Sequence, residues 1–99
     1  MGVPYVLIFE RTEKHIHTLE ESEQVNIRAA LHDLSLWKVN QDIKKLRGAI
    51  HELRFGAHRF IFFRHADFIY VIDGFRKKSQ KTPKAILERS VEIYRLITK

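Results

Sequence analysis

The sequence has no cysteine among its 99 residues, and it holds only two prolines and four glycines. The lack of cysteine excludes a disulfide framework and a thiolate-bound metal. No apolar run reaches the roughly 18 residues that span a membrane, and the apolar segment Val3–Phe9 lacks the basic start of a signal peptide. We therefore expect a cytoplasmic protein, and we assign it no membrane, metal or cofactor.

Positive charge, by contrast, is abundant and concentrated in the C-terminal two thirds of the chain. Lys and Arg number 18 against 12 Asp and Glu, which gives a net charge of +6. Residues 1–37 carry three Lys/Arg and six Asp/Glu, a net −3, whereas residues 38–99 carry fifteen and six, a net +9. This asymmetry predicts a polyanionic or acidic partner, and a well-solvated basic surface is the alternative.

Length and composition predict one domain that covers residues 1–99. Apolar residues make up 44% of the chain, which suffices for one modest core. No repeat, low-complexity segment or linker rich in proline, glycine or serine divides the sequence. We therefore expect no second domain.

Apolar spacing predicts an α+β fold of order β-α-α-β-β-β-α, in which a small, mainly antiparallel sheet has helices on one face. The spacing in the first helix breaks near Ser22, which favours a kink or a short join. Gly48 ends the second helix, and Thr82 caps the last one with Pro83 at its first position. The expected strands are Val3–Phe9, Ala49–Phe55, His58–Arg64 and Phe68–Phe75. The expected helices are about Glu13–Leu36, Trp37–Leu46 and the stretch after Thr82. The apolar stripe of this last helix consists of Ile86, Leu87, Val91, Tyr94 and Ile97.

Alternation along each strand assigns side chains to the two faces of the sheet. In the strand Ala49–Phe55, Leu53 lies on the more apolar face, while Glu52 and Arg54 share the other. The apolar face should meet the helices, which places Arg54 on the open face. The next strand is apolar on both faces, so placing Arg59 beside Arg54 is an assumption.

The segment from Gly74 to Pro83 reads Gly-Phe-Arg-Lys-Lys-Ser-Gln-Lys-Thr-Pro, and it places four cations directly after an apolar strand. This pattern is suited to holding phosphate. Together with Glu52-Leu-Arg54 and with Arg59-Phe-Ile-Phe-Phe63, the segment resembles the RelE/ParE/HigB toxin superfamily. The resemblance is greatest to the HigB-like, phage-derived branch of type II toxin–antitoxin toxins. The motifs lie within residues 38–99, and the order of elements matches over the whole chain.

The resemblance implies an endoribonuclease that cuts messenger RNA in the ribosomal A site without a metal, by attack of a ribose 2′-hydroxyl on the adjacent phosphate. It also implies a basic concave face opposite the helices, and a cognate antitoxin, expected to be a helix-turn-helix protein encoded by the adjacent gene. By matched position the catalytic cations are Arg54, Arg59, Arg76, Lys77 and Lys78. We assign RNA binding to Gln80, Lys81, Arg64 and Lys45.

Fixed cations suit this reaction because negative charge grows on the non-bridging phosphate oxygens in the transition state. The sequence does not decide which residues transfer protons. RelE carries a C-terminal tyrosine implicated in catalysis, and no counterpart follows Thr82 here, since Tyr94 belongs to the apolar stripe of the last helix. The remaining candidates are Lys77, Lys78, Asp73, His51, His58 and His65.

Two other functions remain open at this point. One is a ParE-like gyrase inhibitor on the same fold, which is disfavoured because ParE members generally lack the full set of catalytic cations. The other is a non-catalytic basic module that binds RNA or an acidic protein. The histidines show no metal-site spacing beyond His15-x-His17, so they favour no metalloenzyme.

Overall fold

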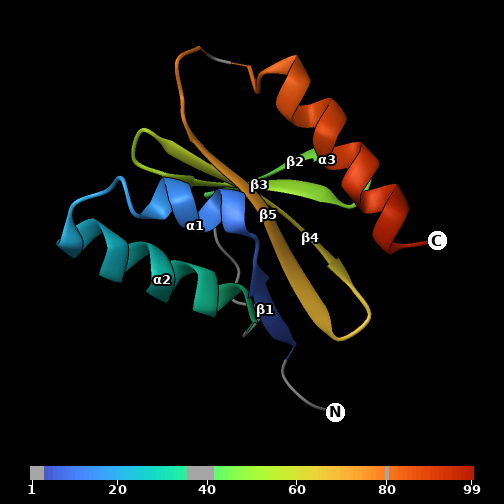
Figure 1. Cartoon of the computed structure of the whole chain (residues 1–99), viewed down its shortest axis with the longest axis horizontal. Helices are drawn as coiled ribbons and strands as arrows, with labels where there is room; N and C mark the ends of the chain where they lie inside the picture. The colour runs from blue at the N-terminus through green and yellow to red at the C-terminus, as the bar shows by residue number, and fades with distance from the viewer. Residues whose placement is uncertain (1–3, 36–41, 80) are drawn as a thin grey trace.

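The computed structural model describes residues 4–35, 42–79 and 81–99, and shows a five-stranded sheet between two helical layers (Figure 1). The strand order is β1-β5-β4-β3-β2, with β1 parallel to β5 and the other pairs antiparallel. The predicted α+β class and mainly antiparallel sheet are confirmed. No helix in the described segments is long and apolar enough to cross a membrane. The elements are β1 (Tyr5–Ile8), α1 (Glu10–Ile16), α2 (Glu21–Ser35), β2 (Ile43–Arg47), β3 (Ile50–Phe55), β4 (His58–His65), β5 (Phe68–Arg76) and α3 (Lys84–Ile97).

Helices cover both faces of the sheet, so the expectation of helices on one face is wrong. Leu53, Phe60 and Phe62 pack with buried side chains of α1 and α2, among them Ile16 and Ile27. On the other face, Ile50, Ile61, Phe63 and Ile72 pack against α3 through Ile86, Val91, Tyr94 and Ile97. The reason lies in β4, which is apolar on both faces and therefore needs a helical cover on each side.

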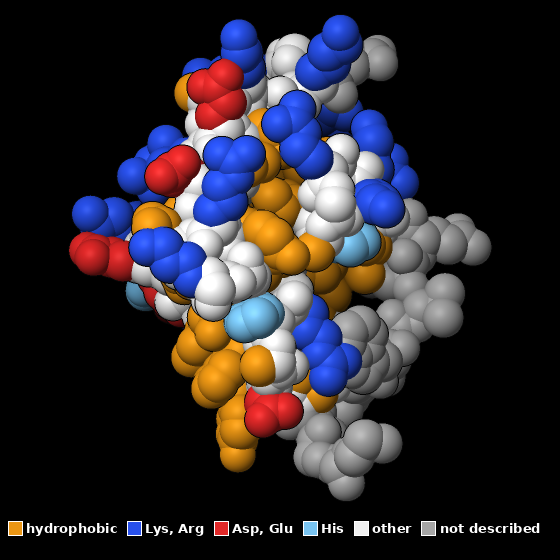
Figure 2. Space-filling view, turned by 90° about the vertical axis from the view of Figure 1, so that its right-hand side faces the viewer, with side chains coloured by type: hydrophobic (Ala, Val, Ile, Leu, Met, Phe, Trp, Pro, Cys, Tyr) orange, Lys and Arg blue, Asp and Glu red, His pale blue; other side chains and the backbone are white. Residues whose placement is uncertain are grey.

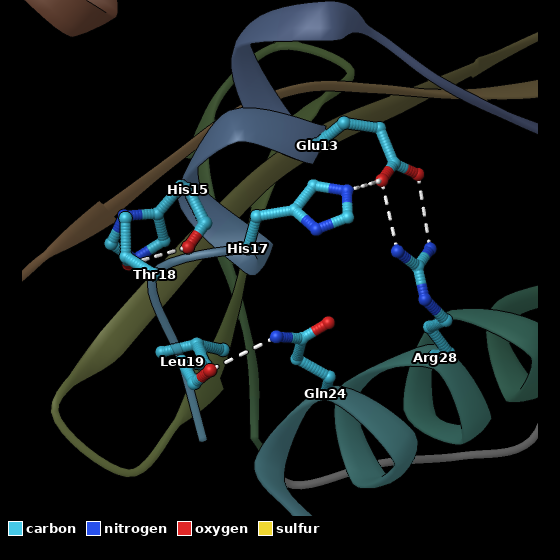
Figure 3. Close-up of polar contacts among 7 residues, drawn as sticks. All are labelled: Glu13, His15, His17, Thr18, Leu19, Gln24 and Arg28. Carbon is cyan, nitrogen blue, oxygen red and sulfur yellow. Dashed lines mark hydrogen bonds and ion pairs between the residues drawn. The ribbon is translucent and has the colours of Figure 1, made fainter. Parts of the chain in front are cut away.

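The predicted helix over Glu13–Leu36 is two helices joined by a corner at residues 17–20. Polar contacts hold the corner together (Figure 3). Glu13 of α1 accepts two hydrogen bonds from the Arg28 guanidinium of α2, at 3.0 and 2.9 Å. The Gln24 side chain donates to the Leu19 carbonyl at 3.0 Å, which satisfies a carbonyl in the corner. The predicted end at Leu36 lies outside the described residues.

The predicted second helix, Trp37–Leu46, is wrong over the part that the structure describes. Residues 43–47 form strand β2, which pairs antiparallel with β3, while residues 37–41 lie outside the described residues. Gly48, with a φ of +55°, makes the turn between β2 and β3 rather than ending a helix. The spacing of Ile43 and Leu46 fits a helix, and the irregular register of β2 between Lys45 and Arg47 explains why strand alternation is hidden.

Candidate functional site

A small pocket lies where β5 ends and the chain approaches α3. Cross-strand pairing brings its residues to one face, because Arg59 of β4 stands opposite both Arg54 of β3 and Phe75 of β5. Arg59 and Arg54 therefore share one face of the sheet, but α3 covers that face, so the open face assumed for both from the sequence is wrong. The lining residues are Glu52, Arg59, Phe75, Lys77, Ser79, Lys81 and Thr82.

An irregularity in β5 helps to build this pocket. Ile61 pairs with Asp73 and Phe62 pairs with Val71, so Ile72 is an extra residue in β5. Such a bulge changes the alternation of the strand beyond it. As a result Asp73 and Phe75 share the α3 face with Ile61 and Arg59. Asp73 is buried there and accepts hydrogen bonds from Arg89 of α3 and from the Gly74 amide.

Arg59 is a buried, fixed cation, with 7% of its surface exposed. Its Nη1 donates to the carbonyls of Gly56 and His58, each at 2.8 Å. Its Nε lies 3.5 Å from Glu52 Oε1, so a carboxylate partly balances its charge. The pocket's excess positive charge therefore comes from the exposed Lys77 and Lys81.

Thr82 connects the start of α3 to the sheet. The predicted role of Thr82 as helix cap is wrong, since Pro83 occupies the cap position and no side chain caps the helix. The Thr82 hydroxyl instead donates to Glu52 Oε2 at 2.9 Å. Glu52 thus contacts Arg59 of β4 with one carboxylate oxygen and Thr82, just before α3, with the other. Sequence reasoning did not assign Glu52, Ser79 or Thr82 to the site, although Glu52 stands in the Glu-x-Arg motif.

The structure divides the predicted cations between the two faces of the sheet. Arg54, Arg59, Lys77 and Lys81 lie on or beside the α3 face, and Lys78 is exposed just after β5. The α1/α2 face carries the predicted cations Lys45, Arg64 and Arg76. Gln80 lies outside the described residues. Arg76 pairs with His58, Lys45 pairs with His51, and Arg64 lines an apolar pocket with Phe62.

The histidines also lie away from the pocket. His15 Nε2 and His58 Nδ1 are hydrogen-bonded at 3.0 Å on the α1/α2 face. Burial is the main reason that the pKa of each ring lies below its ordinary 6.5. A positive charge on His58 lowers the pKa of His15 further. The charges of Arg76 and Arg59 lower the pKa of His58 further. His51 stacks on Phe62 in the same layer. Within the described segments no group of three or more His, Asp or Glu side chains could hold a metal ion.

One side of the molecule is rich in basic side chains (Figure 2). Figure 2 shows the side of the molecule that lies to the right in Figure 1, with Lys and Arg side chains predominating over its upper half. Apolar side chains are exposed between these cations, and acidic side chains are few on this part of the face. The upper end is where β5 leads towards α3. Because helices cover both faces of the sheet, the expectation of a basic face opposite the helices is wrong.

Comparison with known proteins identifies relatives of both the sequence and the fold. A family model described as "Phage derived protein Gp49-like (DUF891)" matches residues 14–95. No curated protein matches the sequence. The resemblance stated from the motifs is therefore confirmed for the phage-derived family.

Solved structures of RelE proteins match the fold at low sequence identity. A chain of the RelE–RelB complex from Pyrococcus horikoshii OT3 has a TM-score of 0.69 and 17% identity, over 81% of this chain and 100% of that one. A chain of the toxin–antitoxin complex RelBE2 from Mycobacterium tuberculosis has a TM-score of 0.62 and 18% identity, over 76% and 100%. The isolated E. coli RelE toxin has a TM-score of 0.60 and 12% identity, over 91% and 98%.

Proposed function

Because the chain belongs to the Gp49-like family of phage-derived proteins and has the fold of the RelE-like toxin superfamily, we propose that it is the toxin of a type II toxin–antitoxin system. Its proposed activity is metal-independent endonucleolytic cleavage of messenger RNA on the ribosome, which stops translation. The observation that supports this most is the pocket that brings Arg59, Lys77 and Lys81 together at the end of the sheet.

The chemistry asked of this pocket is electrostatic. Attack of the 2′-hydroxyl on phosphorus adds negative charge to the non-bridging oxygens, and fixed cations stabilise that charge more than they stabilise the bound substrate. Arg59 is held by three protein oxygens before any ligand arrives, so little reorganisation is needed. Alignment of the message is the ribosome's part, which makes a small and open protein pocket sufficient.

The test replaces exposed cations, because Arg59→Ala would leave the buried Glu52 carboxylate without its cationic partner. Expression of the wild-type chain in a bacterium should arrest growth and cleave translated messages. The Lys77→Ala/Lys81→Ala variant should cleave about 10²–10³-fold more slowly, the cost typical of removing a group that stabilises charge in the transition state. Message cleavage is measured by primer extension on a defined transcript in a translation extract.

The matched control is Lys14→Ala/Lys84→Ala, which removes the same charge from exposed lysines of α1 and α3. It should remain toxic. Full toxicity of the Lys77/Lys81 variant would contradict the assigned site. Induction of DNA damage with intact messages would indicate a gyrase inhibitor, and tight RNA binding without cleavage would indicate a binding module.

We further propose that an antitoxin encoded by the adjacent gene, a helix-turn-helix protein, inhibits this chain in the cytoplasm. Two considerations support this. Three of the structurally similar proteins are complexes named as RelE with RelB or as toxin with antitoxin. A basic surface of this size also favours association with a partner of opposite charge. Co-expression of the adjacent gene should abolish growth arrest and yield a stable complex on purification.

A further inference from the structure

The proposed reaction needs a group that takes the proton of the attacking 2′-hydroxyl. The candidates from the sequence are mostly elsewhere in the structure. His51 and His58 lie on the α1/α2 face, and His65 ends β4 at the hairpin away from the pocket. Asp73 is buried and bound by Arg89. Among the described residues that line the pocket, Glu52 alone carries a carboxylate.

The geometry of Glu52 suits a base of fixed position. The residue is 6% exposed and lies in the pocket with Arg59, Lys77 and Lys81. Thr82 fixes one carboxylate oxygen at 2.9 Å, and Arg59 stands 3.5 Å from the other. A carboxylate accepts about four hydrogen bonds in total. The carboxylate therefore retains acceptor capacity for a hydroxyl group, and its partners hold it in one orientation.

The pocket also combines a carboxylate and ammonium groups, which suit opposite directions of proton transfer. Carboxylates ordinarily carry no proton at neutral pH, whereas lysine ammonium groups carry one. A glutamate and a lysine in the same pocket can thus supply a base for the attacking oxygen and an acid for the leaving oxygen. Cleavage of a phosphodiester by its own 2′-hydroxyl needs both.

We propose that Glu52 is the general base of the cleavage reaction, an inference that rests on the proposed function. The proton of the 2′-hydroxyl moves to the Glu52 carboxylate while the bond from O2′ to phosphorus forms. The bond from phosphorus to O5′ breaks, and the leaving oxygen takes a proton from the Lys77 ammonium group. The products are a 2′,3′-cyclic phosphate and a 5′-hydroxyl, and exchange with water restores the two side chains.

The experiment measures single-turnover cleavage of a defined message by the purified chain on translating ribosomes, as a function of pH. Glu52→Gln keeps the size of the side chain and an acceptor for Thr82, but removes the base. Its cleavage rate should fall about 10²–10⁴-fold, the range typical of general base catalysis. The rise of the wild-type rate with pH on the acid side should disappear. Affinity for a message with a 2′-deoxynucleotide at the cleavage site should stay unchanged.

Two further measurements separate a base from a residue that only positions Arg59. Thr82→Val removes the hydrogen bond to Glu52 but keeps the carboxylate, so it should lose less activity and retain the acid-side rise. A message with sulfur in place of the bridging O5′ needs no protonation of its leaving group. That message should relieve the defect of Lys77→Ala, and it should leave the defect of Glu52→Gln in place.

Several outcomes would overturn the inference. Wild-type rates for Glu52→Gln would do so, as would an intact acid-side rise or a matching loss for Thr82→Val. If Glu52→Gln does not fold, as judged by circular dichroism, Glu52→Asp replaces it and should keep the acid-side rise at a reduced rate. Absence of cleavage by the wild-type chain would reject the proposed function itself. Cleavage by the wild-type chain at a rate that Glu52→Gln does not change would reject only the role of Glu52 as the base.

Discussion

Gly74 shows how one residue without a side chain allows close packing between β5, β4 and α1. It lies in β5 opposite Phe60 of β4, which is fully buried. A Cβ atom at position 74 would stand 2.9 Å from Phe60 Cε1 and 3.3 Å from His15 Cδ2. The missing side chain therefore makes room for a core phenylalanine and for one partner of the histidine pair. Packing thus accounts for the glycine that opens the basic segment Gly74–Pro83.

We predict that Gly74→Ala destabilises the fold by about 1–3 kcal/mol, the typical cost of adding a methyl group to a filled core. Phe60 cannot move aside easily because it is enclosed on all sides. The free energy of unfolding is measured by urea denaturation. As a control, Gly74→Ala/Phe60→Leu should lose less stability than the sum of its single variants. Wild-type stability for Gly74→Ala would contradict the packing role.

At the scale of elements, the pair His15 and His58 connects α1 to β4. Its hydrogen bond, 3.0 Å long, spans 43 residues of sequence and lies beside the α1–α2 corner shown in Figure 3. The charges of Arg76 and Arg59 on the sheet disfavour a proton on His58, whereas Glu23 of α2 favours one. Asp73 favours a proton on His15. Burial is the largest effect for both rings, and it holds the pKa of each ring down.

This pair predicts a pH dependence of stability. Because both pKa values are lowered in the folded protein, the unfolded chain binds more protons at pH values below about 6.5. The pair's contribution to the free energy of unfolding is complete above the unfolded pKa and is lost as pH falls through the folded pKa values. His15→Gln/His58→Gln should therefore flatten the loss of stability between about pH 7.5 and about pH 5.

The measurement is thermal unfolding of both proteins over this pH range. His17→Gln serves as the control, since His17 is an exposed histidine beside Glu13. His17→Gln should leave the difference in melting temperature between about pH 7.5 and about pH 5 close to that of the wild type. An equal pH dependence in the double variant and the wild type would refute the role of the pair.

At the scale of the whole molecule, charge is divided between two faces that the sheet separates. Lys77 and Lys81 lie in the pocket on the α3 face, whereas Lys45 lies on the α1/α2 face. Each phosphate of a single-stranded RNA that binds a cation lowers the slope of log affinity against log salt by about 0.7. The salt dependence of the proposed RNA binding would therefore report which face the RNA touches.

We expect Lys77→Ala to reduce the magnitude of this slope by about 0.7, because one phosphate contact is lost. Lys45→Ala removes the same charge from the opposite face and should leave the slope unchanged. Fluorescence anisotropy of a short labelled RNA at increasing KCl concentrations measures both. If Lys45→Ala reduced the slope as much as Lys77→Ala, RNA would cross both faces and the single-face interface would be rejected.

Much of the fold follows from local patterns in the sequence. The strands β3, β4 and β5 are bounded by turns at Gly56-Ala57 and at residues 66–67, and strong apolar alternation or apolar runs mark them. The apolar stripe of α3 is similarly clear: its predicted members Ile86, Val91, Tyr94 and Ile97 pack against the sheet, together with Ile93, which the predicted stripe did not include. Strand β2 escaped prediction because Ile43 and Leu46 fit a helical spacing, and only pairing with β3 makes this segment a strand.

The sequence by itself determined that the chain is basic in its C-terminal two thirds, that it folds as an α+β domain, and that Arg54, Arg59 and the lysines after β5 are candidates for phosphate binding. These properties depend on composition, on local periodicity and on motif. Tertiary structure alone decided that α3 covers the second face, that the extra residue Ile72 turns Phe75 towards Arg59, and that Glu52 joins Arg59 to Thr82. These depend on strand register and on contacts between residues distant in sequence, such as the 30 positions that separate Glu52 from Thr82.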